Sequence, residues 1–403
     1  MPTMLRPTGP VAGVDTHADT HTLAVVTAQG AVQFTEQFSA DRRGYSALIE
    51  RLQSVENLMT VGVEGTNSYG AELTRALLSA GMSVREVLRP TRQVRRMDGK
   101  SDPVDAIAAA RQVLTGDGTS TPKHTDSPVE ALRYLLTARR NLVRAGARIV
   151  TVIKSLLVTA PEQVRAPLRD LDTPLLIARL AACRPGDDMT DPTTAAKHSL
   201  KLLARDYQHL HAEADDLEDR MTELVTAINP ALREVFGAAT VTSAQLLVTA
   251  GDNPGRITTE AQFAHLCGAA PIPASSGKTR RFRLNRGGDR QANAALHRIA
   301  LVRMRHDRRT RAYVERRTHE NKSKKEILRC LKRAIAREIY RVLLDPTVDA
   351  PCDLRALRTQ KGITQTQAAQ ALQTQPARIS DIERRTRPLP ELTDRYRTWL
   401  NAA

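Results

Sequence analysis

Two aspartates, Asp102 and Asp105, stand three residues apart in the segment G-K-S-D-P-V-D-A at residues 99–106. Helix capping accounts for this pattern, because Asp102 can be the N-cap, Pro103 the first helical residue and Asp105 the third. The same spacing also puts both carboxylates on one face of a helix, as a metal site would need. From this segment alone, capping is the favoured interpretation and a metal site is the alternative.

Two further carboxylates favour the metal site. Asp15 interrupts the apolar stretch V-A-G-V-D, and Glu64 ends the apolar stretch V-G-V-E. A carboxylate is costly to bury without a partner, and neighbouring strands would bring these two together at one edge of a sheet. Four convergent carboxylates repel one another unless a cation lies among them, and Mg²⁺ prefers oxygen ligands. Two such ions about 4 Å apart stabilise the attacking and leaving oxygens of a phosphodiester.

The first of these motifs admits a rival interpretation. Acidic and histidine residues alternate from Asp15 to His21. An unbroken strand would place all four on one face, as a cluster suited to a transition metal. We expect a turn near Ala18 instead. The members after Asp15 would then be polar turn residues, namely His17, Asp19 and His21.

A nucleophile is available in the stretch P-I-P-A-S-S-G-K-T-R-R-F-R-L-N-R-G-G-D-R at residues 271–290, where Ser276 precedes a glycine. A serine hydroxyl attacks poorly without help, and metal ions or guanidinium groups beside a phosphate could activate it. The basic residues that follow are Lys278, Arg280, Arg281, Arg283, Arg286 and Arg290. The competing interpretation is a surface loop that only contacts the DNA backbone, and the residues by themselves favour it.

Short apolar segments predict the elements that would position these residues. Three strands followed by alternating helix and strand indicate a mixed sheet with helices on it. The expected strands are residues 11–17, 22–28, 31–38, 58–64 and 82–88, with helices at 43–53 and 69–80.

Apolar residues then recur at helical spacing over residues 127–157, opposite a face rich in arginine. A second long helical stretch is expected over about residues 193–228. Long antiparallel helices or a coiled coil between subunits would explain this, and a plain helical bundle fits equally. We therefore expect an α/β domain, a long helical region, a mainly helical domain with the serine loop, and a small helical module. The corresponding residues are 10–125, 126–230, 231–345 and 352–400.

The composition indicates the kind of partner. Lys and Arg total 60 against 44 Asp and Glu, which gives a formal net charge of +16 and favours a polyanion such as nucleic acid. Four scattered cysteines give no zinc motif. We expect a soluble cytoplasmic protein, because the chain shows no membrane-spanning apolar run and no signal-peptide core.

The acidic motifs together resemble a known family. Asp15 in G-V-D-T-H, Glu64 in V-G-V-E-G-T-N-S-Y-G and both aspartates of D-P-V-D-A resemble the four acidic positions of the DEDD nuclease domain. That domain is RuvC-like and has the RNase H fold. Over most of residues 10–345 the chain looks like transposases of the insertion-sequence family numbered one-ten.

The resemblance implies a mechanism. It implies that Asp15, Glu64, Asp102 and Asp105 hold Mg²⁺ or Mn²⁺, as two ions, and that Ser276 rather than Ser275 attacks DNA to form a phosphoserine link. It also implies a non-coding bridge RNA that pairs with target and donor DNA, a homo-oligomer (a dimer or tetramer), and a bacterial enzyme at the nucleoid. The residues Lys278 to Arg290 would then bind nucleic acid.

The C-terminal segment, residues 354–385, is similar to a helix-turn-helix of the Cro/repressor type. Gly362 would end the first helix and Thr364 would cap the second. The third, about Pro376 to Arg384, would enter the major groove and expose Gln375, Ala377, Arg378 and Ser380. Two departures could loosen the motif, because Gln373 and Arg385 replace its usual glycines. A degenerate tail that only packs is the alternative.

These observations favour a DNA transposase or recombinase. Two other functions stay open at this point. One is a RuvC-like junction-resolving endonuclease that only hydrolyses, and the other is a DNA-binding regulator with an inactive nuclease fold.

Overall fold

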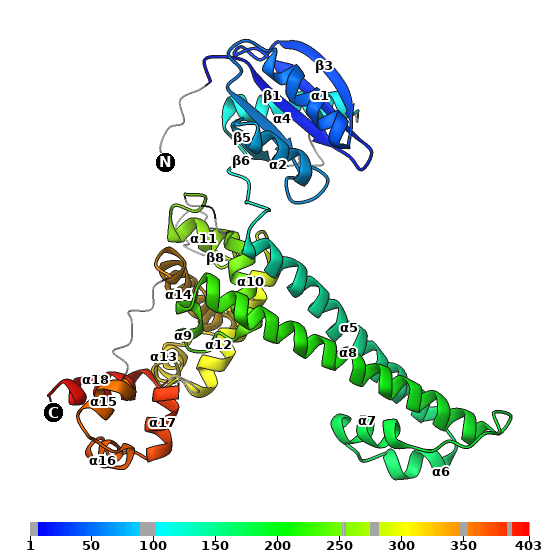
Figure 1. Cartoon of the computed structure of the whole chain (residues 1–403), viewed down its shortest axis with the longest axis vertical. Coiled ribbons are helices and arrows are strands. Elements are labelled where there is room, and N and C mark those ends of the chain that lie inside the picture. Colours follow the sequence, from blue (N-terminus) through cyan, green and yellow to red (C-terminus); the bar gives the residue numbers. More distant parts are fainter. Residues whose placement is uncertain are drawn as a thin grey trace. The chain divides into compact units, whose positions relative to one another are not determined.

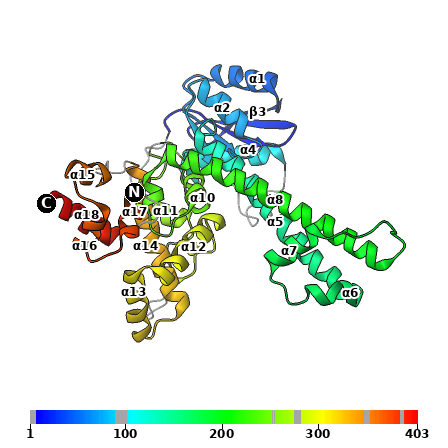
Figure 2. The ribbon, with the colours of Figure 1, turned by 60° about the horizontal axis from the view of Figure 1, so that its bottom comes forward.

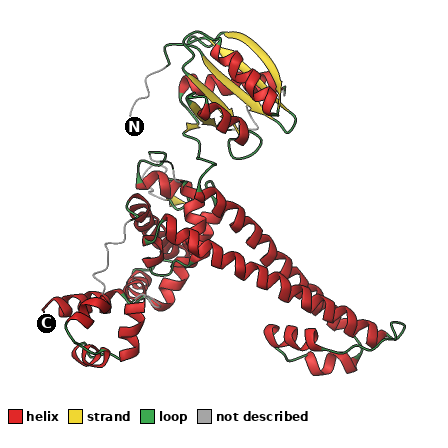
Figure 3. Ribbon diagram, viewed as in Figure 1, coloured by secondary structure: helices red, strands yellow, loops and turns green. Residues whose placement is uncertain are grey.

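The computed structural model of the chain divides into two compact units, Met1–Glu130 with Gly251–Thr258 and Ala131–Ala250 with Thr259–Ala403 (Figure 1). The structure describes residues 7–88, 101–251, 253, 255–274, 282–346, 354–384 and 389–402. The long strands all belong to the first unit, and the second is built almost entirely of helices (Figure 3).

A six-stranded mixed sheet forms the first unit, with strand order β3-β2-β1-β4-β5-β6. β1, β4 and β5 run parallel to one another, while β2, β3 and β6 are antiparallel to their neighbours. The strands are β1 (Val11–Thr16), β2 (Thr20–Val26), β3 (Val32–Ser39), β4 (Thr60–Glu64), β5 (Val84–Val87) and β6 (Thr119–Ser120). The predicted strands and their mixed arrangement are confirmed.

Helices cover both faces of this sheet. The helices α1 (Arg42–Gln53) and α2 (Ala71–Ser79) place their leucines on one face, against the side chains of β1, β2 and β4. The helix α4 (Asp102–Thr115) packs on the other face, against Val11, Val26 and Val87. Because side chains alternate along a strand, each face has its own apolar set. This layered arrangement is consistent with the expected RNase H-like fold.

Two long helices run side by side in the second unit, α5 (Pro128–Thr159) and α8 (Pro192–Ile228) (Figures 1 and 2). They are antiparallel, because Arg139 pairs with Glu218 near one end and Ile153 packs with Leu200 near the other. The short helices α6 (Glu162–Arg165) and α7 (Thr173–Ala182), with a 3₁₀ turn between them, close that second end. The two predicted long helices are confirmed.

A helical lobe follows, centred on α10, whose residues are almost all buried. α10 lies against α8 and α12, and α12 lies against α14. The helices are α9 (Ala231–Glu234), α10 (Thr240–Ala250), α11 (Glu260–Leu266), α12 (Arg290–His306), α13 (Arg308–His319) and α14 (Lys324–Leu344). Between α11 and α12 a small hairpin pairs β7 (Ile272–Pro273) with β8 (Phe282–Arg283).

The C-terminal module has its own small core, to which each of its four helices contributes. The helices are α15 (Leu354–Gln360), α16 (Gln365–Ala371), α17 (Pro376–Arg384) and α18 (Pro390–Ala402). Ile379 and Ile382 of α17 point inward, as the sequence predicts, and Tyr396 of α18 is fully buried.

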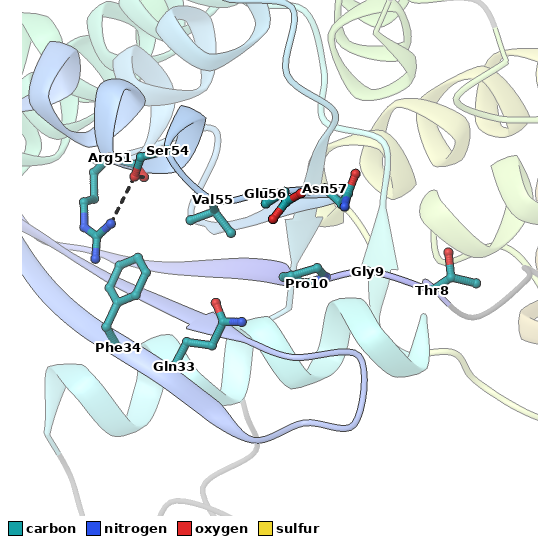
Figure 4. Close-up of a pocket in the computed structure, with 10 residues that line it drawn as sticks. All are labelled: Thr8, Gly9, Pro10, Gln33, Phe34, Arg51, Ser54, Val55, Glu56 and Asn57. Atoms are coloured by element: carbon teal, nitrogen blue, oxygen red, sulfur yellow. Dashed lines mark hydrogen bonds between the residues drawn. The ribbon is translucent and has the colours of Figure 1, made fainter.

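Throughout the described ranges of the chain, none of the helices combines the length and apolar character needed to cross a membrane. One hollow of about 490 Å³ lies beside the amino ends of β1 and β4 (Figure 4). Arg51 there lies over the Phe34 ring, 3.7 Å from its centroid, and donates hydrogen bonds to Ser54 and Glu36. Its guanidinium is thus engaged by its own neighbours, and the acidic residues lie at the opposite ends of these strands.

Candidate active site

Asp15 and Glu64 lie side by side at the carboxyl ends of neighbouring strands. β1 and β4 are parallel with Val14 opposite Val63, so Asp15 and Glu64 follow in the same register. The Thr16 hydroxyl donates a hydrogen bond to the Glu64 carbonyl oxygen at 2.8 Å, which ties the two strand ends together. Asp15 and Glu64 are each only 4% exposed. The expected convergence of these two carboxylates at one sheet edge is therefore present.

Small residues bring α4 against the same face of the sheet. A Cβ at Gly13 would overlap the backbone of Ala106 and Ala110, and a Cβ at Gly62 would lie 2.5 Å from a methyl group of Val113. Gly13 and Gly62 are direct neighbours across the two strands. Because side chains alternate, Asp15 and Glu64, two residues further on, point to the face on which α4 lies. The first turn of α4 therefore starts beside them.

The first turn of α4 carries the other two aspartates. Ser101 is the N-cap, with extended backbone, and Asp102 is already the first helical residue. The interpretation of Asp102 as the N-cap is therefore wrong, because the helix begins one residue earlier than its sequence suggested. Asp105 is buried, at 8% exposure, whereas the Asp102 side chain is 41% exposed. One carboxylate of the pair thus belongs to the interior and the other reaches solvent.

His17 also lies among these carboxylates, a position that its prediction as a turn residue did not include. Its Nε2 lies 3.1 Å from an Asp15 carboxylate oxygen and 3.4 Å from one of Asp102. The His17 amide donates to the Thr20 carbonyl oxygen, so the chain turns here, as predicted, and the alternating transition-metal cluster does not form. The signal that could have identified His17 is its place just past the strand that carries Asp15.

His21 is not a turn residue, so its prediction is wrong. It lies within β2 and is fully buried, with its ring stacked on that of Tyr45 at a centroid distance of 5.6 Å. His17 and Asp19 are exposed and lie in the turn, as predicted.

The electrostatics of this edge disfavour negative charge. Burial raises the pKa of the Asp15 carboxyl group, and the nearby charges of Glu64 and Asp105 raise it further, while His17 acts in the opposite direction. A cation placed among these groups would relieve both effects. Single ligand atoms of Asp15, His17 and Asp102 lie within 4.8 Å of one another. The donor set of carboxylate oxygens with one imidazole therefore fits a divalent cation.

An open hollow of about 480 Å³ lies next to Asp102. It leads from the first turn of α4 to the outer strands β2 and β3. Its lining residues are Thr22, Thr35, Glu36, Gln37, Ser101, Asp102 and Pro103. A polar hollow of this kind gives a ligand direct access to the exposed carboxylate of the group.

The predicted serine loop lies largely outside the described residues. Ser275, Ser276, Lys278, Arg280 and Arg281 all belong to residues 275–281, which fall there. The strands on either side are described, and Ile272 pairs with Arg283 while Pro273 pairs with Phe282. The three remaining basic residues are exposed: Arg283 in β8, Arg286 in the following turn and Arg290 at the start of α12.

A polar network anchors the chain just after this hairpin. Asp289 caps α12 by accepting hydrogen bonds from the amides of Gln291 and Ala292, and it accepts another from the Thr249 hydroxyl at 2.6 Å. The Asp289 amide donates to the Leu266 carbonyl oxygen.

Further along α12, Asn293 donates to two carbonyl oxygens at the end of α11, those of Cys267 and Gly268. It accepts a hydrogen bond from the buried Lys332 ammonium at 2.8 Å. The base of the serine-bearing hairpin is therefore held by partners distant in sequence, which local pattern analysis had no means of finding.

The C-terminal module places most of its predicted contact residues on the surface. Gln375 and Ala377 are exposed, while Arg378 and Ser380 are half-buried. Thr364 caps α16 in a reciprocal capping box with Gln367, as the sequence predicts for Thr364. Gln373, where the motif usually has glycine, adopts a left-handed backbone with φ of 52°.

The fold and the acidic edge define a nuclease-type domain with an RNase H-like sheet, joined to a helical lobe and a helix-turn-helix. Comparison with protein families agrees. Residues 12–160 match the DEDD transposase domain of IS110 elements, residues 229–315 match the transposase family IS116/IS110/IS902, and residues 354–392 match a helix-turn-helix. The chain belongs to the IS110 family of transposases, which confirms the resemblance found in its sequence.

A relative extends this likeness over nearly the whole chain. The insertion element IS900 uncharacterized 42 kDa protein of Mycobacterium paratuberculosis is 24% identical over 395 residues, spanning 86% of this chain and 98% of the relative. Family membership makes this protein an enzyme that cuts and rejoins DNA, and its helix-turn-helix makes it DNA-binding.

Proposed function

We propose that this transposase exchanges DNA strands through a phosphoserine intermediate formed at Ser276, with divalent metal ions held by Asp15, Glu64, Asp102 and Asp105. The observation that carries the proposal is the gathering of buried carboxylates at one sheet edge. Evolution rarely places several acidic side chains together in an interior without a ligand, because each disfavours the charge on the others. The four domains expected from the sequence become the working parts of this scheme.

The acidic edge would hold Mg²⁺ or Mn²⁺, and we propose two ions. When bound, they would supply positive charge to the non-bridging oxygens of a phosphodiester and to its leaving oxygen. The half-exposed Asp102 is the member best placed to share a cation with a substrate. His17 hydrogen-bonds to Asp15 and lies 3.4 Å from Asp102, so it would fix the orientation of these two carboxylates.

The chemistry requires two balanced steps. In the first, the Ser276 Oγ forms a bond to phosphorus, one bridging P–O bond of the DNA breaks, and the released oxygen takes up a proton as a hydroxyl. In the second, a hydroxyl of another DNA end attacks the phosphoserine, and Ser276 leaves with its proton restored. Because the bond energy is kept in the intermediate, strands can be joined without an external energy source.

Basic side chains around the hairpin would hold the DNA during this exchange. We assign phosphate contacts to Lys278, Arg280, Arg281, Arg283, Arg286 and Arg290. The exposure of the last three suits that role. Guanidinium groups bind phosphate oxygens with paired hydrogen bonds, so they position the backbone as well as neutralise it.

The wider assembly is also part of the proposal. The C-terminal module would present Gln375, Arg378 and Ser380 to the major groove of the element ends. A non-coding bridge RNA would select target and donor DNA by pairing, and a dimer or tetramer would bring two DNA ends together. The net charge of +16 suits a complex with two nucleic acids.

Two variants of neighbouring serines test the nucleophile. Ser276→Ala should abolish strand exchange and the covalent protein–DNA adduct, whereas Ser275→Ala should retain both. The measurement is recombination between two plasmids, combined with mapping of the adduct by mass spectrometry. Strand exchange that persists in Ser276→Ala would overturn the proposal, and cutting without joining in that variant would favour a hydrolytic nuclease.

The guide is tested separately, because it could fail while the serine chemistry holds. The protein is co-expressed with the sequences flanking its own gene and purified, and the retained RNA is sequenced. A single defined transcript is expected. Retention of only random cellular RNA, in proportion to abundance, would argue against a bridge RNA.

A further inference from the structure

A second basic site lies in the helical unit, in a groove between α5, α10 and α12. The groove has a volume of about 200 Å³. Liquid water occupies about 30 Å³ per molecule, so the groove has room for a ligand of several heavy atoms. Its apolar lining consists of Leu136, Val143, Val241, Ala294 and Ala295, and its polar lining consists of Arg139, Arg140, Arg144, Thr242, Gln245, Gln291 and Arg298.

The charges that line this groove are positive. Arg139 forms an ion pair with Glu218 at 2.5 Å and is therefore neutralised. Among the residues that the structure describes, Arg140, Arg144 and Arg298 form no ion pair with a carboxylate. Burial lowers the pKa of Arg140, and the charges of Arg144 and Arg298 add to this effect, while Asp289 acts in the opposite direction. Three guanidinium groups thus gather at one groove without a compensating anion.

Asp289, the acidic group that acts on the Arg140 charge, already has hydrogen-bond partners of its own. One oxygen of Asp289 accepts from the amides that begin α12, and the other accepts from the Thr249 hydroxyl and the Gln245 amide. Arg140 instead donates one hydrogen bond to the Gln245 side-chain oxygen at 2.7 Å. A guanidinium has five N–H donors, so most of those on Arg140 stay available to a ligand.

We infer that this groove binds a phosphodiester of a nucleic-acid backbone, held by Arg140, Arg144 and Arg298. Three cations around a hollow with a few amide and hydroxyl groups match the non-bridging oxygens of a phosphate. Contacts from guanidinium groups to phosphate oxygens carry no sequence information directly, so we expect this contact to be independent of sequence. This site is distinct from the arginines of the hairpin, and it does not depend on Ser276 or on the acidic edge.

The groove also adjoins the network that anchors the serine-bearing hairpin. Gln245 bridges Arg140 to Thr249 and Asp289, with hydrogen bonds of 2.7, 3.1 and 3.5 Å. A nucleic-acid backbone bound in this groove would consequently be held at a fixed position relative to α12, the helix that follows the hairpin. That gives this site a positioning role in a protein that must hold long DNA or RNA segments in place.

Binding measured as a function of salt tests the inference. The full-length protein is titrated into a labelled duplex DNA of mixed sequence and into single-stranded RNA of matching sequence, with EDTA present to prevent cleavage. Arg144→Ala and Arg298→Ala should each weaken binding roughly fourfold. This is about what one phosphate contact contributes to the affinity of a protein that binds nucleic acid independently of sequence. The slope of log K against log salt should shrink by about 0.9 on duplex DNA or about 0.7 on a single strand.

A matched control separates this contact from net charge. Arg220 on α8 is exposed and pairs with Asp216 at 2.8 Å, so Arg220→Ala removes one positive charge away from the groove. It should leave affinity and slope unchanged. Both test arginines are exposed, and circular dichroism verifies that each variant keeps its helices.

The two nucleic acids distinguish the source of the phosphate. A loss confined to RNA would assign the groove to the guide, and a loss on DNA would assign it to a DNA segment; each supports the phosphodiester site. Affinities and slopes that match the wild type on both, or that change equally in Arg220→Ala, would overturn it.

Discussion

Among the residues that the structure describes, the buried carboxylates of the acidic edge and of the C-terminal module have opposite surroundings. In the C-terminal module the Glu383 side chain is 1% exposed and is surrounded by donors, the Arg358 guanidinium, the Gln365 amide and the Tyr396 hydroxyl. Burial opposes its charge, but these hydrogen bonds prevail and lower its pKa. At the acidic edge, burial and neighbouring carboxylates raise the pKa of Asp15.

The difference separates a structural acid from a functional one. Glu383 has its full complement of partners within the fold, so it contributes stability and needs no ligand. Asp15 shares its edge with Glu64 and Asp105, and the surroundings favour its charged form only once a cation arrives. An acidic cluster that the fold leaves uncompensated is therefore the better indicator of a metal-dependent site.

The largest effect is expected when a carboxylate of the acidic edge is neutralised. Asp15→Asn should reduce strand exchange about 1,000-fold, because a divalent cation contributes several kcal/mol to the barrier. The stability of the sheet should not fall. The amide is uncharged, so neither burial nor the charge of Glu64 disfavours it. Plasmid recombination measures the first quantity, and hydrogen exchange of peptides covering residues 11–26 measures the second. A parallel loss of both would make Asp15 a structural residue.

The corresponding change in the C-terminal module should show the reverse behaviour. Glu383→Gln leaves the Arg358 charge buried without its partner and should lower the unfolding free energy of this module by about 3 kcal/mol. The fluorescence of Trp399, the only tryptophan in the chain, reports this module alone. Glu391→Gln, at an exposed position of α18, is the control and should have little effect. Equal midpoints for the two variants would contradict the comparison.

The position of the acidic edge depends on the contact between α4 and the sheet. Gly13→Ala introduces a methyl group into the backbone of α4 and should destabilise the first unit by about 2 kcal/mol, with a matching loss of strand exchange. Gly146→Ala is the control, because a Cβ there meets the Tyr207 ring at an ordinary 3.5 Å. That change should stabilise α5 by up to about 1 kcal/mol. Thermal unfolding of both variants measures these changes in stability.

Acidity should affect the two carboxylates in opposite directions. The pKa of Glu383 is lowered by folding, so its contribution is present above about pH 4.3, the ordinary glutamate value, and is lost as the pH falls further. The pKa of Asp15 is raised by folding, so its contribution becomes unfavourable as the pH rises above about 3.9, the ordinary aspartate value, where the unfolded chain ionises first.

Two measurements check this pH dependence. Trp399 fluorescence in metal-free protein should show the C-terminal module losing stability in acid. Asp15→Asn should gain stability over the wild type near neutral pH, and the gain should vanish in acid. A gain that is independent of pH would mean that folding does not shift the pKa of Asp15.

The smallest effect concerns a turn. Gln373 has φ of 52°, a region that costs an ordinary residue about 1–2 kcal/mol and glycine almost nothing. Gln373→Gly should stabilise the C-terminal module by about 0.5–1 kcal/mol after the entropy of glycine is subtracted. Gln370→Gly, the same change inside α16, should destabilise it by about 1 kcal/mol. Changes of the same sign in the two variants would show that the backbone conformation does not matter.

Elements with a strong local pattern were predictable from the sequence. The apolar strands, the two long helices and the first three of the four helices after residue 353 follow the periodicity of their own side chains, and Thr364 carries its capping partner three residues away. The start of α4 was placed one residue late, because two adjacent polar residues, Ser101 and Asp102, can both serve as an N-cap. Residues 275–281, with the proposed nucleophile, lie outside the described structure, so the assignment of Ser276 stays a proposal.

In the candidate site, too, some features were predictable from the sequence and others depended on the tertiary structure. The chain alone identifies Asp15 and Glu64 as carboxylates in apolar strands, whereas helix capping would explain Asp102 and Asp105 equally well. Their meeting depends on the pairing of β1 with β4 and on the contact between the strand glycines and α4, which join residues about 50 to 100 positions apart. The place of His17 among the carboxylates, the anchor around Asp289 and the arginine groove arise in the same manner, because contacts between distant segments leave no periodic trace in the order of amino acids.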